Sequence, residues 1–393
     1  MAAKKKSSKG LTFFAALISV IVGLAVGLVL PLYLAESYFT QNIYTDEFAP
    51  KEIAPMDIEG IDDADISVHF IELGNKYTGD CTLIKVGDVE LLIDCGSRAD
   101  SVQTVAGYLN NYVTDGVIEY VIITHAHQDH YAGFATPAKI PSIFDLYECE
   151  TIITFAATNQ SATNATYKNY LRELNEEIES GATHYTAADC YNGENGAQKT
   201  YDLGANYELE ILYNRYYWEQ TTKENDYSVC CMINGNGRYF LFTGDLEEPG
   251  EASLAARYVD DHSEIDFDNF SVDLYKAGHH GSKTSSTEYF LSVFKPQNCC
   301  VCCCAGSKEY TSTAANQFPT QDFINRISVY TDKVYVTTLC VDYDNNEFTS
   351  FNGNIVFMVK NGELGINCSH NSLPLKDSEW FANSGRERPA SWA

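Results

Sequence analysis

Positively charged residues are scarce in this sequence. Its 393 residues include 26 Lys and Arg against 54 Asp and Glu, which gives a formal net charge of −28. Tight, non-specific nucleic-acid binding needs Lys and Arg to neutralise phosphates, so the composition argues against a protein that coats DNA or RNA. Internal repeats and long low-complexity runs are also lacking. That lack argues against a repeat architecture and leaves one large or two small globular domains.

The N-terminus carries a long apolar run without a charged residue, at 11–35. A bilayer core needs about 20 apolar residues as a helix, so the run predicts a transmembrane anchor. Four lysines lie in residues 1–10, and acidic residues follow the run. This asymmetry predicts a single-pass protein of the cell membrane, with its N-terminus inside and its main domain extracellular. A cleaved signal peptide is the alternative, although its apolar core is usually only about 7–15 residues long.

The chain after the apolar run divides into three parts. Residues 36–64 contain Pro and acidic residues with weak periodicity and predict a linker. Residues 65–365 alternate short β-rich runs with helical patterns such as SVQTVAGYLNNYV and GEASLAARYV, which predicts one α/β domain. Two runs of strands, each interleaved with helices, favour an αββα sandwich. The polar residues 366–393 predict a C-terminal tail that wraps the surface or frays.

Five of the thirteen cysteines fall within residues 299–304. Neighbouring residues of a strand point to opposite faces, so these five thiols cannot converge on one metal ion. We interpret them as small apolar residues of a buried strand, with a metal or disulfide cluster as the less favoured alternative. The odd total leaves at least one free thiol unless two chains are cross-linked.

The most informative segment is VIITHAHQDHYAG, in which an apolar strand runs into a loop with His125, His127, Asp129 and His130. Imidazole and carboxylate groups are the ligands that a borderline-soft divalent metal prefers. His125 and His127 are two residues apart and can face one ion, while Asp129 and His130 turn toward a second. Four such groups on one loop are rare by chance, so a surface cluster without metal is the less favoured alternative.

The pattern H-x-H-x-D-H after an apolar strand resembles the signature of the metallo-β-lactamase superfamily. Three more segments resemble the metallo-β-lactamase-like domain of the ComEC/Rec2 DNA-uptake proteins: HFIELGNKYTGDCTLIKVGDVELLIDCG, ENDYSVCCMINGNGRYFLFTGDLE and LYKAGHHGSKTSS. The similarity spans about 66–360. It implies a metallo-β-lactamase sandwich, here without the membrane channel of the DNA-uptake proteins.

The resemblance implies a site for up to two metal ions and a metal-activated water as nucleophile. By this comparison His125 and His127 bind the first ion, and Asp129 and His130 bind the second. Asp245 then bridges both ions, because a carboxylate between two cations neutralises both. Further positions of the pattern, expected to support the ligands or contact substrate, are Asp80, Asp94, Asn225 and Ser228.

The candidate catalytic residues are Asp129, His279 and His280. One of the two adjacent histidines could fill an open coordination position, and one could donate a proton to the leaving oxygen or hold a phosphate. Ser282 and Lys283, which follow them, suit contact with an anionic group.

Two histidines of the ComEC-like pattern are missing. Tyr213 stands where the pattern has His in L-H-P, and Phe318 where it has His in G-H-P. Either the site binds metal weakly or holds one ion, or else His184, Tyr213 or the His279–His280 pair substitutes. The remaining histidines are expected to be structural or on the surface: His69, which lies in a predicted strand, His262 and His370.

These observations together predict a membrane-anchored, extracellular metallo-hydrolase that cleaves a phosphodiester or related ester. Zinc is the favoured metal, with manganese or iron as alternatives. The candidate substrates are nucleic acid, as for a nuclease, and phosphate esters of cell-surface polymers. The rival hypothesis is a surface binding protein with a degenerate, metal-poor hydrolase site, which Tyr213 and Phe318 would explain.

Overall fold

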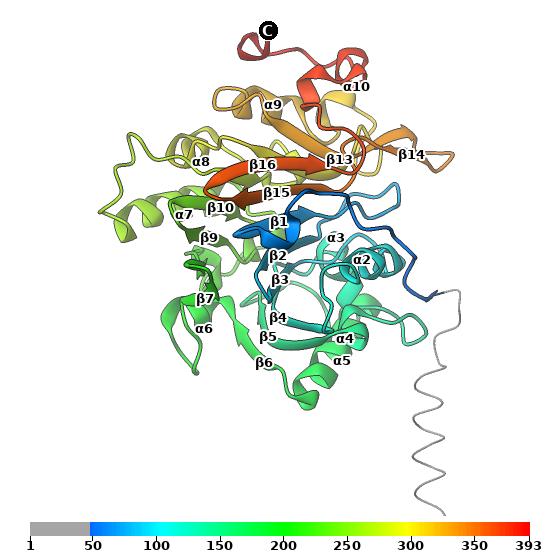
Figure 1. Cartoon of the computed structure of the whole chain (residues 1–393), viewed down its shortest axis with the longest axis vertical. Coiled ribbons are helices and arrows are strands. Elements are labelled where there is room, and N and C mark those ends of the chain that lie inside the picture. The colour runs from blue at the N-terminus through cyan, green and yellow to red at the C-terminus, as the bar shows by residue number, and fades with distance from the viewer. Residues whose placement is uncertain (1–47) are drawn as a thin grey trace, which may run out of the picture. The chain divides into compact units, whose positions relative to one another are not determined.

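The computed structural model of the chain describes residues 48–393 (Figure 1). The predicted cytoplasmic tail, the predicted anchor at 11–35 and the first part of the predicted linker lie outside the described residues. Among residues 48–393, no helix is long and apolar enough to cross a membrane.

Two eight-stranded sheets form the centre of the fold. The first sheet has antiparallel pairing around β1 and parallel pairing from β3 to β6. The C-terminal hairpin pairs with β1 and thereby completes this sheet. In spatial order its strands are β16 (Glu363–Cys368), β15 (Ile355–Lys360), β1 (Ile66–Phe70), β2 (Thr82–Val86), β3 (Val89–Ile93), β4 (Val117–Ile123), β5 (Glu148–Thr154) and β6 (Thr183–Thr186).

The second sheet is antiparallel from β7 to β10 and parallel from β10 to β13. In spatial order its strands are β14 (Glu347–Ser350), β13 (Val334–Asp342), β12 (Cys299–Ala305), β11 (Leu274–Lys276), β10 (Arg238–Phe242), β9 (Cys231–Gly235), β8 (Tyr207–Ile211) and β7 (Thr200–Gly204). The two sheets face each other through apolar side chains, as the 6.3 Å between the ring centres of Phe70 and Phe242 shows.

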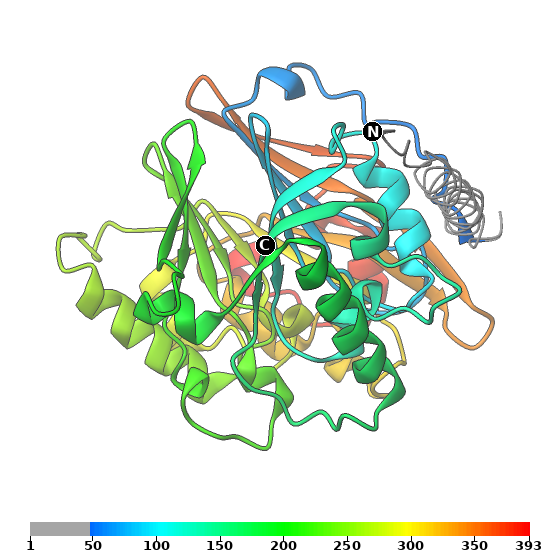
Figure 2. The same ribbon diagram turned by 90° about the horizontal axis from the view of Figure 1, so that it is seen from below.

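Helices cover the outer faces of both sheets, and Figure 2 shows α5 and α7 on opposite sides of the strands. The first sheet carries α2 (Ser101–Leu109), α4 (Ile143–Leu146) and α5 (Ala165–Ser180), and the second α7 (Glu248–Asp261), α8 (Glu288–Phe294) and α9 (Gln321–Ile327). Shorter helices are α3 (Gln128–Tyr131), α6 (Ala187–Asn192) and α10 (Glu379–Asn383). The predicted αββα sandwich is the observed architecture.

Helix ends follow from local sequence. Asn164 caps α5, because its side-chain oxygen accepts hydrogen bonds from the N–H groups of Thr166 and Tyr167 at 3.0 and 3.2 Å. Gly181 ends the same helix with a positive φ of 132°. The helix buries Tyr170 and Leu174 against the first sheet.

The cysteine-rich segment forms β12, and all seven residues of this strand are buried. Cys300 and Cys302 belong to the core between the sheets, while Cys299 and Cys303 belong to the core under the outer helices. All thirteen cysteines of the chain are free thiols. The interpretation as core residues is confirmed, and the alternation of a strand explains it.

The predicted C-terminal tail, 366–393, begins inside β16 and then packs on the second sheet's outer core. Phe381 and Trp392 are buried there with ring centres 5.6 Å apart. The Trp392 indole N–H donates to the carbonyl of Thr331 at 2.9 Å.

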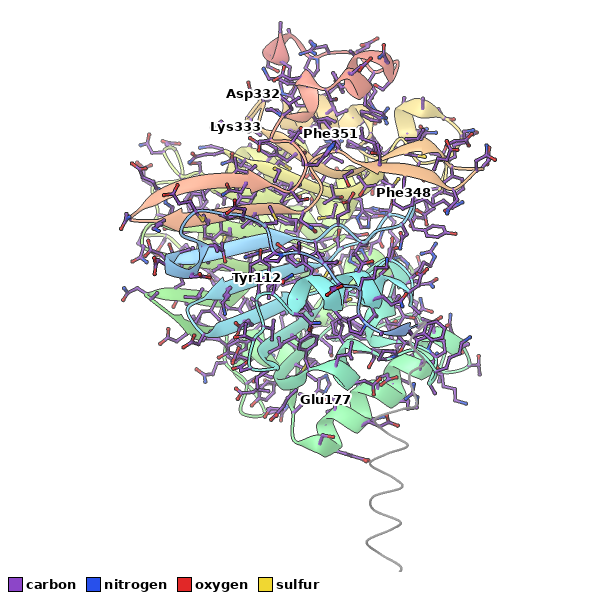
Figure 3. All side chains as sticks on the ribbon, turned by 45° about the vertical axis from the view of Figure 1, so that its right-hand side comes forward. Tyr112, Glu177, Asp332, Lys333, Phe348 and Phe351 are labelled. Carbon is purple, nitrogen blue, oxygen red and sulfur yellow. The ribbon has the colours of Figure 1, made fainter. Side chains whose placement is uncertain are left out.

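His69 has the structural role expected of it. It is fully buried in β1, with Nδ1 2.8 Å from the Tyr108 hydroxyl and Nε2 2.8 Å from Ser67 Oγ. Tyr112, labelled in Figure 3, packs on its ring with centres 4.5 Å apart. Burial, with a further contribution from the charge of Lys85, lowers the pKa of His69 from 6.5 to about 3.

This lowered pKa predicts a pH-dependent stability. Between pH 6.5 and 3 the unfolded chain binds a proton at residue 69 that the folded chain does not, so stability falls as pH falls below 6.5. Within this interval each pH unit changes the free energy of unfolding by about 1.4 kcal/mol. The titration of His69 alone should therefore lower the free energy of unfolding by about 2 kcal/mol between pH 7 and pH 5. His69→Gln, which does not titrate, should lose correspondingly less over this interval in urea unfolding. An identical pH dependence for His69→Gln, wild type and the exposed-site control His370→Gln would refute the assignment.

Candidate metal centre

The candidate site lies where parallel strands of both sheets end. Asp94 follows β3, His125 follows β4, Asp245 follows β10, and residues 278–281 follow β11. Asp80 precedes β2, whose first residue pairs with the last residue of β3. The carboxyl ends of parallel strands meet at one edge of a sheet, so segments far apart in sequence converge at this edge.

The predicted ligand loop connects β4 to α3. The first turn of α3 folds it back, because the His130 N–H donates to the His127 carbonyl at 3.0 Å. His125 and His130 are fully buried, whereas His127 and Asp129 are half-buried. The loop therefore carries two buried candidate ligands, His125 and His130, and two half-buried ones, His127 and Asp129.

Two pairs of imidazole nitrogens face each other. His125 Nε2 lies 3.1 Å from His127 Nδ1, and His130 Nε2 lies 3.2 Å from His280 Nε2. Two nitrogen ligands of one tetrahedral zinc ion, each about 2.0–2.1 Å from it, lie about 3.3 Å apart. Each pair therefore has the spacing of two ligands on one ion.

Asp245 lies between the two pairs. Its Oδ2 is 3.2 Å from His130 Nε2, 3.5 Å from His280 Nε2 and 3.9 Å from His125 Nε2. Its Oδ1 is buried, has no hydrogen-bond partner and lies 3.8 Å from Lys276 Nζ. Buried polar atoms are normally paired, and a cation is a partner that suits a carboxylate oxygen.

Asp129 adds a second carboxylate, with Oδ2 3.5 Å from His280 Nε2. The donor set thus offers two imidazoles to one position, two imidazoles and a carboxylate to another, and Asp245 to both. This set fits two divalent ions of the zinc, manganese or iron type.

Neighbouring acceptors fix which ring nitrogen faces this centre. The Nδ1–H of His130 donates to Asp94 Oδ2 at 2.8 Å, and the Nδ1–H of His280 donates to the Cys302 carbonyl at 2.9 Å. Both Nε2 atoms are therefore directed toward Asp245, the orientation that a metal ligand needs. Thr124 holds Asp94 in turn, donating through its N–H and its hydroxyl at 2.8 and 2.7 Å.

The local charges favour a cation. Burial raises the pKa of Asp245, but His130 and His280 outweigh it and hold that pKa well below its usual range. Burial and the neighbouring charge of His130 keep the pKa of His125 well below 6.5, so its lone pair stays free. Burial lowers the pKa of His280, but the carboxylates of Asp245 and Asp80 outweigh it and raise that pKa to about 10. A divalent cation would displace this proton and take its place among the carboxylates.

Asp80 contacts the outer edges of the histidines. Asp80, His130, Asp245 and His280 each offer a ligand atom within 4.8 Å of the others. However, Asp80 Oδ2 forms an ion pair with the buried Lys276, and its Oδ1 lies 3.1 Å from His280 Nδ1, the side away from the centre. Asp80 therefore neutralises Lys276 and lies behind His280, whose Nδ1–H donates to the Cys302 carbonyl.

The adjacent histidines point in different directions because the backbone turns left-handed. His279, His280 and Gly281 have φ values of 47°, 53° and 76°. Residues with a Cβ rarely adopt this region, and such conformations concentrate at functional sites. His280 is fully buried at the centre, whereas the His279 side chain is 21% exposed at its mouth.

His279 lies beside the centre. Its Nε2 is 3.8 Å from Asp245 Oδ2, and its Nδ1 is 3.0 Å from Thr284 Oγ1. Asn225 Nδ2 lies 3.3 Å from the same Nδ1. Thr284 Oγ1 also contacts Ser282 Oγ at 3.0 Å. The predicted serine is thus connected to the site through Thr284 and His279.

Two other predicted residues are placed differently. Ser228 Oγ accepts a hydrogen bond from the Asp245 N–H at 3.0 Å and donates one to the Asn225 carbonyl at 2.7 Å. Ser228 therefore fixes the backbone at Asp245 and at Asn225. Lys283 is exposed. Its carbonyl accepts a hydrogen bond from Arg326 at 3.0 Å.

The other candidates for the missing histidines lie elsewhere. Tyr213 stacks on Trp218 with ring centres 5.6 Å apart, and His184 Nε2 contacts Thr154 Oγ1 at 2.9 Å in β6. Phe318 packs on the rings of His279 and His280, with centres 5.7 and 5.8 Å away. The geometry thus favours His280 among the substitutes.

Sequence reasoning missed two residues of this site. Lys276 stands in the quoted segment LYKAGHHGSKTSS, where a lysine inside an apolar strand already indicated a buried partner. Tyr310 donates to Asp129 Oδ2 at 2.9 Å from a loop far downstream, and no local pattern marks it.

Comparison with known proteins identifies the family of this chain. The family model "Anti-Pycsar protein Apyc1" matches residues 72–285, more than half of the chain, which therefore belongs to this family. Competence protein ComA of Neisseria gonorrhoeae is 24% identical over 259 residues, 65% of this chain and 29% of ComA. ComE operon protein 3 of Bacillus subtilis is 32% identical over 74 residues, 19% of this chain and 8% of that protein. The chain spans less than a third of the length of these relatives.

Among solved structures, the metallo-β-lactamase fold protein YhfI from Bacillus subtilis is 11% identical with a TM-score of 0.38, covering 70% of this chain and 96% of YhfI. Human tRNase Z, short form, is 13% identical with a TM-score of 0.31, covering 72% and 98%. The predicted similarity to ComEC/Rec2-type proteins agrees with the matches to these competence proteins.

The two adjacent histidines point in different directions, so substituting them should affect metal binding differently. His280→Asn should weaken one bound ion by more than about ten-fold, because a ligand is lost, while His279→Asn should keep wild-type metal content. Asn tolerates left-handed backbone, so both variants keep the turn. Metal content after dialysis at a fixed free zinc concentration measures this. Loss of metal in His279→Asn with none in His280→Asn would contradict the assignment.

Proposed function

We propose that this protein is a metal-dependent phosphodiesterase whose centre holds two divalent ions. The observation that carries the proposal is the convergence of His125, His130 and His280 on Asp245 Oδ2, at 3.2 to 3.9 Å, with His127 beside His125 at 3.1 Å. His125 and His127 would hold one ion, and His130, His280 and Asp129 the other. Asp245 would bridge them.

The bound ions would supply a water acidified enough to act as a nucleophile near neutral pH. The chain's own residues do the rest. Asp94 and the Cys302 carbonyl hold His130 and His280 in the required tautomers. His279, at the mouth and tied to Thr284, is placed to hold a phosphate oxygen or to give a proton to the leaving oxygen.

The surroundings of the site favour a compact phosphate ester over a long polyanion. Two cations near it are already paired, Lys223 with Glu247 and Arg98 with Glu309. The net charge of −28 adds long-range repulsion toward a polyanion. Relatives named for competence keep nucleic-acid esters among the candidates, beside phosphate esters of cell-surface polymers.

We further propose that residues 11–35 anchor the chain in the cell membrane with residues 50–393 outside. The apolar run and the lysines before it support this topology. Substrates of an outward-facing enzyme would be found outside the cytoplasm.

A binding protein with a degenerate site is the second candidate, and the missing histidines at Tyr213 and Phe318 favour it. The two hypotheses differ in metal content. The phosphodiesterase binds about two ions per chain, whereas the degenerate protein binds almost none.

Hydrolysis of bis(p-nitrophenyl) phosphate by the full chain, in detergent with zinc or manganese supplied, tests the proposal. Asp245→Asn should lower the rate by about 10²–10³-fold, since the carboxylate that neutralises both ions is lost. A chelator should abolish wild-type activity, and added metal should restore it. The matched control is Asp344→Asn, an exposed hairpin residue that should keep the wild-type rate.

Equal rates for Asp245→Asn and wild type would refute the mechanism. A wild type that binds almost no metal after growth with zinc and manganese would favour the binding protein.

A further inference from the structure

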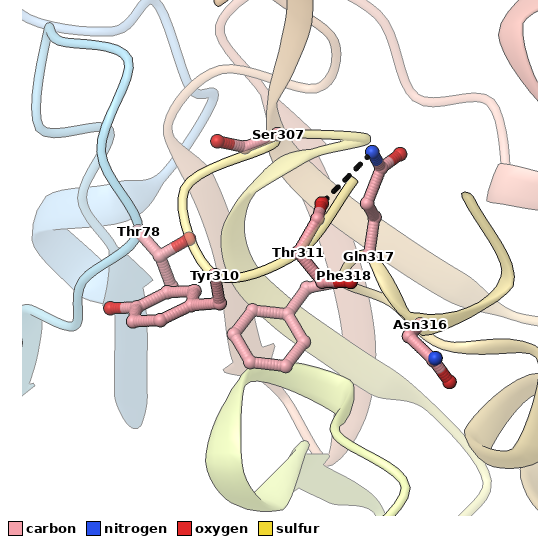
Figure 4. Close-up of a pocket in the computed structure, with 7 residues that line it drawn as sticks. All are labelled: Thr78, Ser307, Tyr310, Thr311, Asn316, Gln317 and Phe318. Atoms are coloured by element: carbon pink, nitrogen blue, oxygen red, sulfur yellow. Dashed lines mark hydrogen bonds between the residues drawn. The ribbon is translucent and has the colours of Figure 1, made fainter. Parts of the chain in front are cut away.

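We propose that Tyr310 is a positioning residue of the metal centre, which acts by fixing Asp129. The inference rests on the proposed two-ion function. Tyr310 lies in the loop at 306–320, which follows β12 (Figure 4). Its hydroxyl donates to Asp129 Oδ2 at 2.9 Å.

The oxygen that Tyr310 contacts is the one that faces the centre. Asp129 Oδ2 is also 3.5 Å from His280 Nε2, so the same atom meets the tyrosine and the ligand histidine. A half-buried carboxylate can rotate about its last bonds, and each free rotation reduces the fraction of time spent in the ligand geometry. A donor fixed on the far side restricts that rotation.

The loop holds Tyr310 in place through three contacts. The Glu309 carboxylate accepts from the Thr78 N–H at 2.9 Å and from Arg98 at 2.9 Å. Phe318 packs on the Tyr310 ring (Figure 4), and the ring centres are 5.4 Å apart. Phe318 also lies against the two site histidines. The contacts of the half-buried Glu309 and Phe318 thus set the position of the hydroxyl.

Tyr310 is 57% exposed, so burial alone does not explain its position. An aromatic side chain in a loop, with more than half its surface in water, gains little from apolar contact. Its hydrogen bond to Asp129 and the anchored neighbour Glu309 account for the geometry instead.

Two effects of the hydroxyl oppose each other. Donation to Asp129 withdraws some negative charge from the ligand, which weakens its attraction for the ion. It also holds the ligand in place, which strengthens binding. Loss of an outer partner of a metal ligand typically costs about 10–100-fold in metal affinity, so orientation outweighs charge withdrawal.

The experiment uses Tyr310→Phe in the full chain, which removes the hydroxyl and keeps the ring. Zinc is titrated against a chromophoric chelator, and the hydrolysis rate is followed at rising zinc. One of the two ions should bind about ten-fold more weakly than in wild type, and the other should be unchanged. Saturating zinc should restore the wild-type kcat. Tyr289→Phe, a tyrosine 50% exposed on α8, is the matched control and should behave as wild type.

A second variant tests the anchor. Glu309→Gln should weaken the same ion by less, and the double variant should match Tyr310→Phe alone, because Glu309 acts through the tyrosine. Additive losses would contradict this route.

Wild-type affinity for both ions in Tyr310→Phe would overturn the role of Tyr310 and leave the phosphodiesterase standing. A wild type that binds no zinc would overturn the function and the inference together.

Discussion

A single buried carboxylate governs this site. Asp245 Oδ2 lies within 3.9 Å of nitrogens from four histidines, and its other oxygen has no hydrogen-bond partner. Without a counter-charge such a group would be costly to bury. The two imidazole pairs, the carboxylate of Asp129 and the left-handed turn at His279 and His280 are arranged around it. Two bound cations would offset the free-energy cost of burying the Asp245 carboxylate.

The fold supplies this arrangement through strand ends. Each sheet contributes parallel strands that stop at one edge, and the residues after them carry the ligands. Behind the ligands lies a layer of fixed partners: Asp94 on His130, the Cys302 carbonyl on His280, and Lys276 on Asp80. Cys302 belongs to the cysteine-rich strand, so that unusual strand also shapes the metal centre. The small thiol side chains let β12 pack in both cores while its backbone orients a ligand.

Local patterns predicted much of this. The periodicity of strands and helices predicted the sandwich. The loop His125–His130 predicted four metal ligands, because they are close together in the sequence. The role of His280 could not be assigned, since a turn with φ near 50° at two non-glycine residues is decided by tertiary packing. Tyr310 could not be predicted, because it lies 181 positions after Asp129 in the sequence and contacts it only in the folded chain. The sequence showed Tyr213 and Phe318 as departures from the pattern, but only the folded structure places Phe318 against His280.

Anomalous diffraction from crystals grown with zinc would test the central claim most directly. Two peaks are expected, one between His125 and His127 and one between His130 and His280, with Asp245 contacting both. Bound ions at both positions would establish the carboxylate as their bridge. The absence of any peak among these four histidines, or a peak only at Asp80 beside Lys276, would contradict the account.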